Sequence, residues 1–258
     1  MVRFIDFKGA NVAVVAKTTK PHPKLPGTIY TAVEEIEKAG GKGLAIACDI
    51  RDEQSVQEAV DKTVQTFGGI DIVVNNASAI SLTSTEETPM KKYDLMHSIN
   101  GRGTYLVTKL TAPHLKKSSN AHVLTISPPL DMFSQGTNWF KNHPAYTMAK
   151  YSMTLYTYGF AEEFKSDKIA FNTLWPRTAI ATAAVQNLLG GDESIKRSRK
   201  PEIMADAAYT ILTSKSETKT GKYYMDDEVL ISLGCFELSK YACVPGTKDD
   251  EFMPDYFC

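Results

Sequence analysis

Tyr146 and Lys150 are the residues whose types and spacing best suit proton-transfer chemistry. They lie four apart in residues 145–164, a stretch with helical character, so one turn places both on the same face. The pKa of a phenol is about 10, and a neighbouring ammonium favours the phenolate and lowers that pKa. A tyrosine tuned in this way can act as a general acid or base. The same spacing also fits a partly buried tyrosine beside a surface lysine.

Other polar groups follow the predicted strands. Asn75-Asn76-Ala77-Ser78 comes after the apolar run 70–74, Ser127 follows the run 121–126, and Asn100 lies at the start of a predicted helix. Ligands of an open parallel sheet bind at the carboxyl ends of its strands. We therefore expect these groups to converge with Tyr146 at one sheet edge.

The elements that must position these groups alternate along the chain, which is typical of parallel βαβ units. Asp52 and Pro144 suit helix starts, and Gly40 suits a left-handed position after a helix. The pattern predicts one α/β domain over residues 1–258, with a core at 8–230 and a C-terminal wrap at 231–258. The predicted strands are 11–16, 43–48, 70–74, 121–126 and 169–174, and the predicted helices are 31–38, 53–67, 106–115 and 145–164.

The order of these motifs resembles the short-chain dehydrogenase/reductase family from about residue 11 to 230: Asn-Asn-Ala after a strand, Asn100, Ser127, Tyr146-x-x-x-Lys150 and then Asn172-Thr173-Leu174-Trp175-Pro176. The resemblance implies a Rossmann-like, doubly wound parallel sheet. It also implies that Tyr146 exchanges the proton, that Lys150 lowers its pKa and holds the nicotinamide ribose, that Asn100 anchors a relay water, and that Ser127 stabilises the oxyanion.

NADP is the cofactor that the resemblance favours. Lys17 directly follows the second family strand, where a cation meets the 2′-phosphate of NADP and an acid would select NAD. The other implied contacts are Asp49 at the adenine ring, Asn76 and Ala77 against the adenosine ribose, and Ile180 and Thr182 beside the carboxamide.

The first family strand is missing from this sequence, together with the Thr-Gly-x-x-x-Gly-x-Gly turn and helix that hold the pyrophosphate. The resemblance begins at residues 8–11. Residues 2–5 have the character of a short strand, but a parallel neighbour needs a crossover of about a dozen residues, and only residues 6–10 intervene. We therefore predict an empty central position in the sheet.

Two functions are consistent with this pattern. One is an NADP-dependent oxidoreductase that interconverts a carbonyl and a secondary alcohol on a small, lipid-like substrate, as a homo-oligomer. The other is a truncated paralogue or isoform, deficient in cofactor binding, that acts as a non-catalytic oligomer subunit.

Composition narrows the partners and the compartment. Lys and Arg number 29 against 30 Asp and Glu, which gives no reason to expect a nucleic-acid partner. No apolar run approaches the about 18 residues of a transmembrane helix, and the five histidines lack metal-ligand spacing, so we expect no membrane span and no metal. The four scattered cysteines fit a reducing, intracellular compartment, and the resemblance implies a peroxisome or mitochondrion.

Three further segments carry expectations. The basic run 196–200 is expected to be a solvated loop rather than a phosphate site. Arg177 replaces a family glycine and either faces solvent or meets an anion such as a coenzyme A phosphate. The aromatic residues Phe133, Trp139 and Phe140 are expected to wall a substrate pocket.

Overall fold

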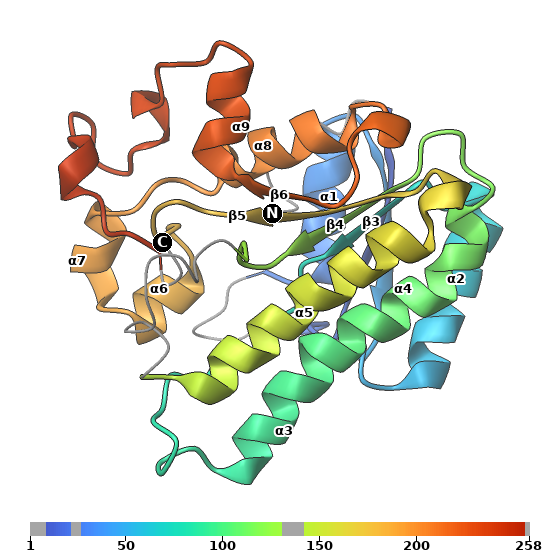
Figure 1. Cartoon of the computed structure of the whole chain (residues 1–258), viewed down its shortest axis with the longest axis horizontal. Coiled ribbons are helices and arrows are strands. Elements are labelled where there is room, and N and C mark those ends of the chain that lie inside the picture. The colour runs from blue at the N-terminus through green and yellow to red at the C-terminus, as the bar shows by residue number, and fades with distance from the viewer. Residues whose placement is uncertain (1–8, 22–26, 131–141, 256–258) are drawn as a thin grey trace.

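The computed structural model describes residues 9–21, 27–130 and 142–255 and has two parallel sheets in that part of the chain (Figure 1). In the first sheet β1 (Asn11–Ala16) pairs with β2 (Lys42–Ala47). The second has the order β3 (Ile72–Asn75), β4 (His122–Ile126), β5 (Ala170–Trp175) and β6 (Lys222–Met225). The expected α/β architecture with a parallel sheet is confirmed. The predicted strand at 2–5 and the aromatic loop at 133–140 lie outside the described residues.

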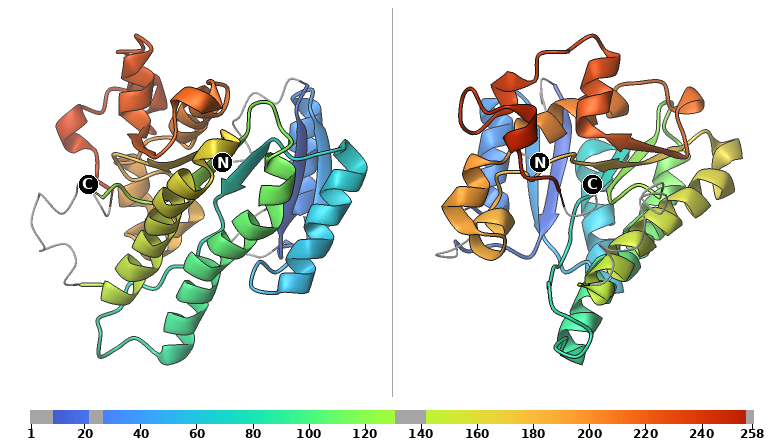
Figure 2. Two further views of the ribbon diagram at one scale, coloured as in Figure 1. Left: turned by 45° about the vertical axis from the view of Figure 1, so that its right-hand side comes forward. Right: turned by 60° about the vertical axis from the view of Figure 1, so that its left-hand side comes forward.

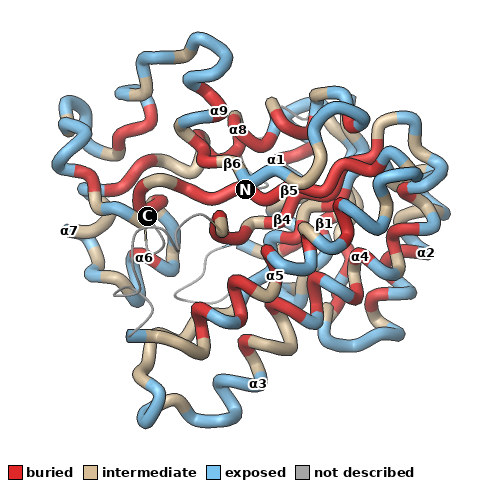
Figure 3. The backbone as a smooth tube through the Cα atoms, in the orientation of Figure 1, coloured by how far each residue is buried: buried red, intermediate tan, exposed pale blue. Residues whose placement is uncertain are grey.

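Helices cover both faces of the four-stranded sheet (Figure 1). On one face, Val123 and Phe171 pack against α4 (Gly101–Leu115) and α5 (Pro144–Glu163). On the other, Leu124 and Leu174 pack against α8 (Glu202–Leu212) and α9 (Asp226–Ser232). Because consecutive strand residues point to opposite faces, both faces of these strands are apolar and buried, as the red strands of Figure 3 show. This rigid core fixes the strand ends that carry the polar motifs.

The two-stranded sheet has its own helices. Val14 of β1 packs against α1 (Ile29–Lys38), and Ile46 of β2 packs in a cluster with α2 (Glu53–Phe67) and Leu106 of α4. Helix α2 is therefore the element that connects the small sheet to α4, and ion pairing of Lys109 with Glu53 adds to this contact.

Local signals correctly predicted several ends of the helices that the sequence indicated. The side chain of Asp52 accepts a hydrogen bond from the backbone N–H of Ser55 (2.7 Å) at the start of α2, and Pro144 is the first residue of α5. Gly40 adopts a left-handed φ of 89° just after α1. The periodicity of the sequence did not predict six elements of the structure, which are α3 (Met90–Ile99), α6 (Ala183–Leu188), α7 (Gly191–Lys196), α8, β6 and α9.

The central position predicted to be empty is empty among the described residues. Each of β1 and β3 pairs with a strand on one side only, and Figure 2 shows the blue β1–β2 pair set apart from the larger sheet. One side chain of each strand is open to solvent, since Val15 is 36% and Ile72 is 44% exposed. An edge of this kind leaves backbone N–H and C=O groups unpaired.

The segment after α9 returns to the carboxyl end of β5. The backbone N–H of Ala179 donates to Met253 O (2.8 Å), and that of Asp255 donates to Arg177 O (3.1 Å). The C-terminal segment therefore lies alongside residues 177–179. Among the described residues, the structure contains no helix long and apolar enough to span a bilayer.

Candidate active site

Tyr146 and Lys150 lie on the buried side of α5, next to the end of β4. Tyr146 is 7% exposed and packs in a cluster with Met96 and Trp175, with Ile126 against it. The Lys150 ammonium, on a side chain only 2% exposed, donates to the carbonyl of Ile126 (2.6 Å) and lies 5.1 Å from the centre of the Trp175 ring. The helix thus places both side chains at the carboxyl end of the sheet.

The lowering of the Tyr146 pKa by Lys150 stays a prediction, and burial in this structure acts against it. Burial raises the pKa of the Tyr146 phenol, and the nearby carboxylate of Asp255 raises it further. Burial also lowers the pKa of Lys150 to about 7, an effect that Asp255 partly opposes. Burial therefore acts against both the phenolate of Tyr146 and the charged form of Lys150. The neutral phenol is the favoured form.

Ser127 is the first residue after β4 and follows the Ile126 carbonyl that Lys150 contacts. Its side chain is fully buried, and its hydroxyl has no hydrogen-bond partner among the described residues. A buried hydroxyl without a partner is costly in a protein interior. A ligand oxygen placed here would accept the hydrogen bond that Ser127 otherwise lacks.

Asn100 lies at the break between α3 and α4. Its side-chain amide is fully buried and is committed to one residue, since Oδ1 accepts from the Ala79 N–H (2.8 Å) and Nδ2 donates to Ala79 O (3.1 Å). This pair of bonds fixes the chain after the Asn-Asn-Ala motif. The Asn100 backbone carbonyl accepts a long bond of 3.3 Å from the Thr104 N–H, and a role of Asn100 in anchoring water stays a prediction.

Lys17 and Asp49 come together at the carboxyl ends of β1 and β2. Lys17 Nζ lies 3.6 Å from Asp49 Oδ2, and Arg51 binds both carboxylate oxygens of Asp49. The hydrogen bond to Arg51 holds the pKa of Asp49 well below its usual range. Two cations at this corner form a site suited to an anion, although Asp49 already occupies part of their hydrogen-bonding capacity.

The remaining predicted cofactor residues lie at strand ends along the same edge. Asn76 and Ala77 are exposed directly after β3. Ile180 is 9% exposed beyond β5, and Thr182 caps α6 by accepting from the Val185 N–H (3.5 Å). Their positions agree with the expected edge, and their contacts with a cofactor stay a prediction.

Arg177 neither faces solvent freely nor meets an unpaired anion. Its guanidinium pairs with Asp227 (3.0 Å) and Glu228, and its backbone N–H donates to Asp226 Oδ1 (2.9 Å). Asp226 is fully buried, and burial raises its pKa to about 6. The side chain of Arg177 therefore fastens α9 to the end of β5.

Sequence reasoning missed Asp255 as a residue of this site. Its carboxylate acts electrostatically on both Tyr146 and Lys150, yet it lies more than a hundred positions away in a segment without helical or strand periodicity. No local signal in the sequence predicts that the C-terminal segment returns to this edge.

The chain belongs to the short-chain dehydrogenase/reductase family. A family model described as enoyl-(acyl carrier protein) reductase matches residues 8–227. Among solved structures, a putative dehydrogenase from Xanthomonas campestris superposes with a TM-score of 0.90 at 48% identity, covering 97% of this chain and 89% of that one. A short-chain dehydrogenase from Mycobacterium thermoresistibile gives a TM-score of 0.88 at 56% identity, covering 96% of this chain and 86% of that one.

Curated relatives include two proteins named hydroxysteroid dehydrogenase-like protein 2. The Xenopus tropicalis protein is 56% identical over 96% of this chain and 58% of its own length. The human protein is 53% identical over 96% of this chain and 57% of its own length. The chain therefore spans less than two thirds of the length of these relatives.

Proposed function

We propose that this chain is an NADP-dependent oxidoreductase that interconverts a carbonyl and a secondary alcohol. The observation that carries the proposal is the buried, unpartnered hydroxyl of Ser127, next to the Ile126 carbonyl that Lys150 contacts and on the same edge as Tyr146. A substrate oxygen in this position would accept a hydrogen bond from Ser127 and exchange a proton with Tyr146. Polar groups arranged in this way stabilise charge that develops on the oxygen.

The residues present suit the two ends of the cofactor better than the pyrophosphate between them. Lys150 and Ser127 suit the nicotinamide end, where bound NADP supplies or accepts the hydride. Lys17 is exposed beside Asp49 and suits the 2′-phosphate. The part of the chain that the structure describes offers no glycine-rich turn at a helix start for the pyrophosphate.

Burial favours carbonyl reduction over alcohol oxidation at neutral pH. The raised pKa of Tyr146 keeps the phenol protonated, which is the form that donates a proton to a carbonyl oxygen. Oxidation requires the phenolate instead. We therefore propose that reduction is the faster direction near pH 7.

A lipid-like substrate is supported by the relatives, whose name refers to a hydroxysteroid dehydrogenase.

A homo-oligomer is supported by exposed apolar side chains on α4 and α5, among them Tyr105 (46% exposed) and Leu155 (56% exposed). A peroxisomal or mitochondrial address rests on the family resemblance alone, and imaging of a tagged chain tests it.

A second candidate is a non-catalytic oligomer subunit deficient in cofactor binding. The unpaired edges of β1 and β3 favour it, because the strand and turn that would occupy this position carry the pyrophosphate site in the family. Such a subunit would pair through α4 and α5 without turnover.

NADPH binding and NADPH oxidation with a panel of ketones, aldehydes and steroid ketones separate the two functions. For the enzyme we expect Tyr146→Phe to lower kcat by about 10²- to 10⁴-fold with little change in NADPH affinity. Tyr156→Phe is the matched control, since Tyr156 lies on the same helix and is 40% exposed. Saturable NADPH binding without turnover, or equal rates for wild type and Tyr146→Phe, would refute the catalytic proposal.

A further inference from the structure

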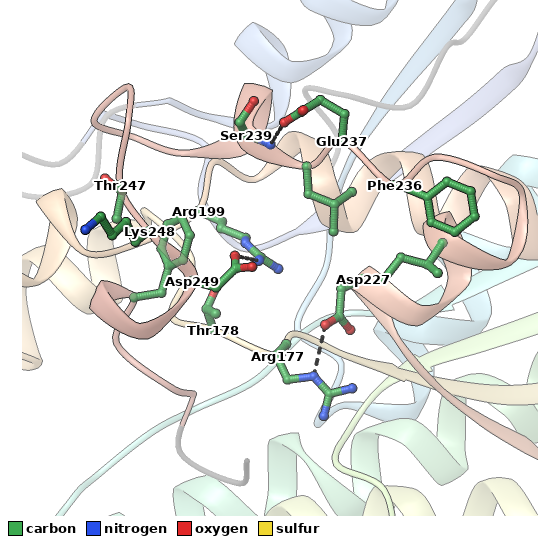
Figure 4. Close-up of a pocket in the computed structure, with 13 residues that line it drawn as sticks. Arg177, Thr178, Arg199, Asp227, Phe236, Glu237, Ser239, Thr247, Lys248 and Asp249 are labelled. Carbon is green, nitrogen blue, oxygen red and sulfur yellow. Dashed lines mark hydrogen bonds and ion pairs between the residues drawn. The ribbon is translucent and has the colours of Figure 1, made fainter.

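A pocket of about 660 Å³ lies between the segment after β5, helix α9 and the C-terminal segment (Figure 4). Arg177 and Thr178 line it on one side, and Phe236, Asp249 and Phe252 are among the residues from the C-terminal part of the chain. None of Tyr146, Lys150 and Ser127 lines it. The pocket is therefore distinct from the candidate active site.

Arg199 is held rigidly in this pocket by its own backbone. Its N–H donates to Ala179 O (2.9 Å), and its carbonyl accepts from the Ala181 N–H (2.9 Å). The residue is only 5% exposed, and Figure 4 shows the guanidinium directed between Asp249 and Asp227. The expectation of a solvated basic loop at 196–200 is therefore wrong at Arg199, because this strand-like pairing turns its side chain inward.

The guanidinium of Arg199 has too few acceptors for a buried cation. One nitrogen, Nη2, lies 3.4 Å from Asp249 Oδ1, on a side chain that is 95% exposed. The other two nitrogens, Nε and Nη1, are buried without a hydrogen-bond partner among the described residues. An exposed ion pair contributes little, whereas an unsatisfied buried cation is costly. The Asp249 carboxylate therefore contacts one of the three guanidinium nitrogens, and the other two remain available to an anion.

Two further features define what the ligand must be. The Thr178 hydroxyl is a second buried group without a partner in the described chain, and the Phe252 ring lies 4.8 Å from the Arg199 guanidinium carbon. At the rim, Phe236 is 78% exposed and Ile231 is 40% exposed. A polar, cationic end therefore continues into an apolar, solvent-facing wall.

The acidic residues of the pocket limit the charge of the ligand. Asp227, Glu237 and Asp249 all line it, and Arg177 is already paired with Asp227 and Glu228. Three cations, Arg177, Arg199 and Lys248, line the pocket with these three acids. Among these cations in the described chain, Arg199 is the one with buried nitrogens that lack a hydrogen-bond partner, so the ligand feature that the pocket needs is one anionic group at Arg199.

We propose that the pocket binds a small amphipathic monoanion, a carboxylate carried on an apolar chain. Its carboxylate displaces Asp249 from Arg199 and accepts from Thr178, and its chain lies against Phe236 and Ile231. Asp249 acts as an internal competitor that keeps the cation partly satisfied while no ligand is bound.

Calorimetric titration of the whole chain with octanoate tests the proposal, with octan-1-ol, acetate and inorganic phosphate as comparison probes. We expect saturable octanoate binding and much weaker binding of the three other probes. Octan-1-ol lacks the negative charge, acetate lacks the apolar chain, and inorganic phosphate lacks both the apolar chain and the single charge. Binding of octanol equal to that of octanoate, or no octanoate binding up to millimolar concentration, would overturn the proposal.

Two surface variants locate the site while the Arg199 side chain itself is kept. Asp249→Asn should tighten octanoate binding by about two- to fivefold, since it removes a competing exposed ion pair. Phe236→Ser should weaken binding by about tenfold. Asp250→Asn is the matched control for Asp249, because Asp250 is an adjacent exposed acid that does not line the pocket. Unchanged affinity in both Asp249→Asn and Phe236→Ser would place the ligand elsewhere and refute the assignment.

Discussion

Replacement of Lys150 by methionine should remove a specific part of the pH dependence of stability. Lys150 is buried, and its folded-state pKa is lowered from 10.5 to about 7. The unfolded chain therefore binds a proton that the folded chain releases between these two values. As a consequence, the folded state is most favoured above pH 10.5 and loses stability as the pH falls toward 7.

The magnitude follows from this interval. At about 1.4 kcal/mol per pH unit, the fall from 10.5 to about 7 corresponds to about 5 kcal/mol in total. Between pH 7.5 and pH 9 the contribution of Lys150 to the free energy of unfolding rises by about 2 kcal/mol. Methionine has no titratable group. The loss of the hydrogen bond to the Ile126 carbonyl should change the free energy of unfolding of the variant by the same amount at each pH.

Urea unfolding at pH 7.5, 8 and 9 without cofactor measures the effect. We expect the free energy of unfolding of the wild type minus that of Lys150→Met to increase by about 2 kcal/mol across this range. Lys165→Met is the control, since the Lys165 side chain is 66% exposed, in contrast to the buried side chain of Lys150. A difference that stays constant with pH would mean that Lys150 keeps its proton throughout, and the argument from burial would fail.

Two other substitutions test packing and burial. Asp226→Asn keeps an acceptor for the N–H groups of Arg177 and Asp227. In the wild type, the Asp226 contribution to the free energy of unfolding should fall by about 3 kcal/mol as the pH rises from 3.8 to about 6. The variant should not show this fall. Unfolding curves at pH 4.5 and pH 7 cover about 2 kcal/mol of this loss, and an equal loss in the variant would contradict the argument. Gly43→Ala should destabilise the protein by about 1–3 kcal/mol, because its Cβ would lie 2.5 Å from Val33 Cγ1 and 3.1 Å from Val33 Cα. Gly69→Ala meets no atom within 4 Å and should change thermal stability little, so equal melting temperatures for the two variants would refute the clash.

Periodicity in the sequence predicted the strands up to β5 and the helices between them other than α3, because these signals are local. The helix at 53–67 and the strand at 11–16 match α2 and β1 at both ends. Elements after β5 were missed, and the region from 202 to 232 forms α8, β6 and α9. The apolar residues of α8, such as Ile203, Ala207 and Ile211, are buried against the second face of the sheet, and this face exists only once the sheet has formed.

The sequence by itself determined that Tyr146 and Lys150 share one face of a helix, because a spacing of four depends only on helix geometry. It also placed Asn76 and Ser127 just beyond strands, since each lies within two residues of the end of a predicted strand. The tertiary structure alone decided that Lys150 is desolvated, that Arg199 is turned inward and that Asp255 returns to Tyr146. These outcomes depend on contacts between segments far apart in the chain, and the removal of water from a charged group is a property of the assembled fold.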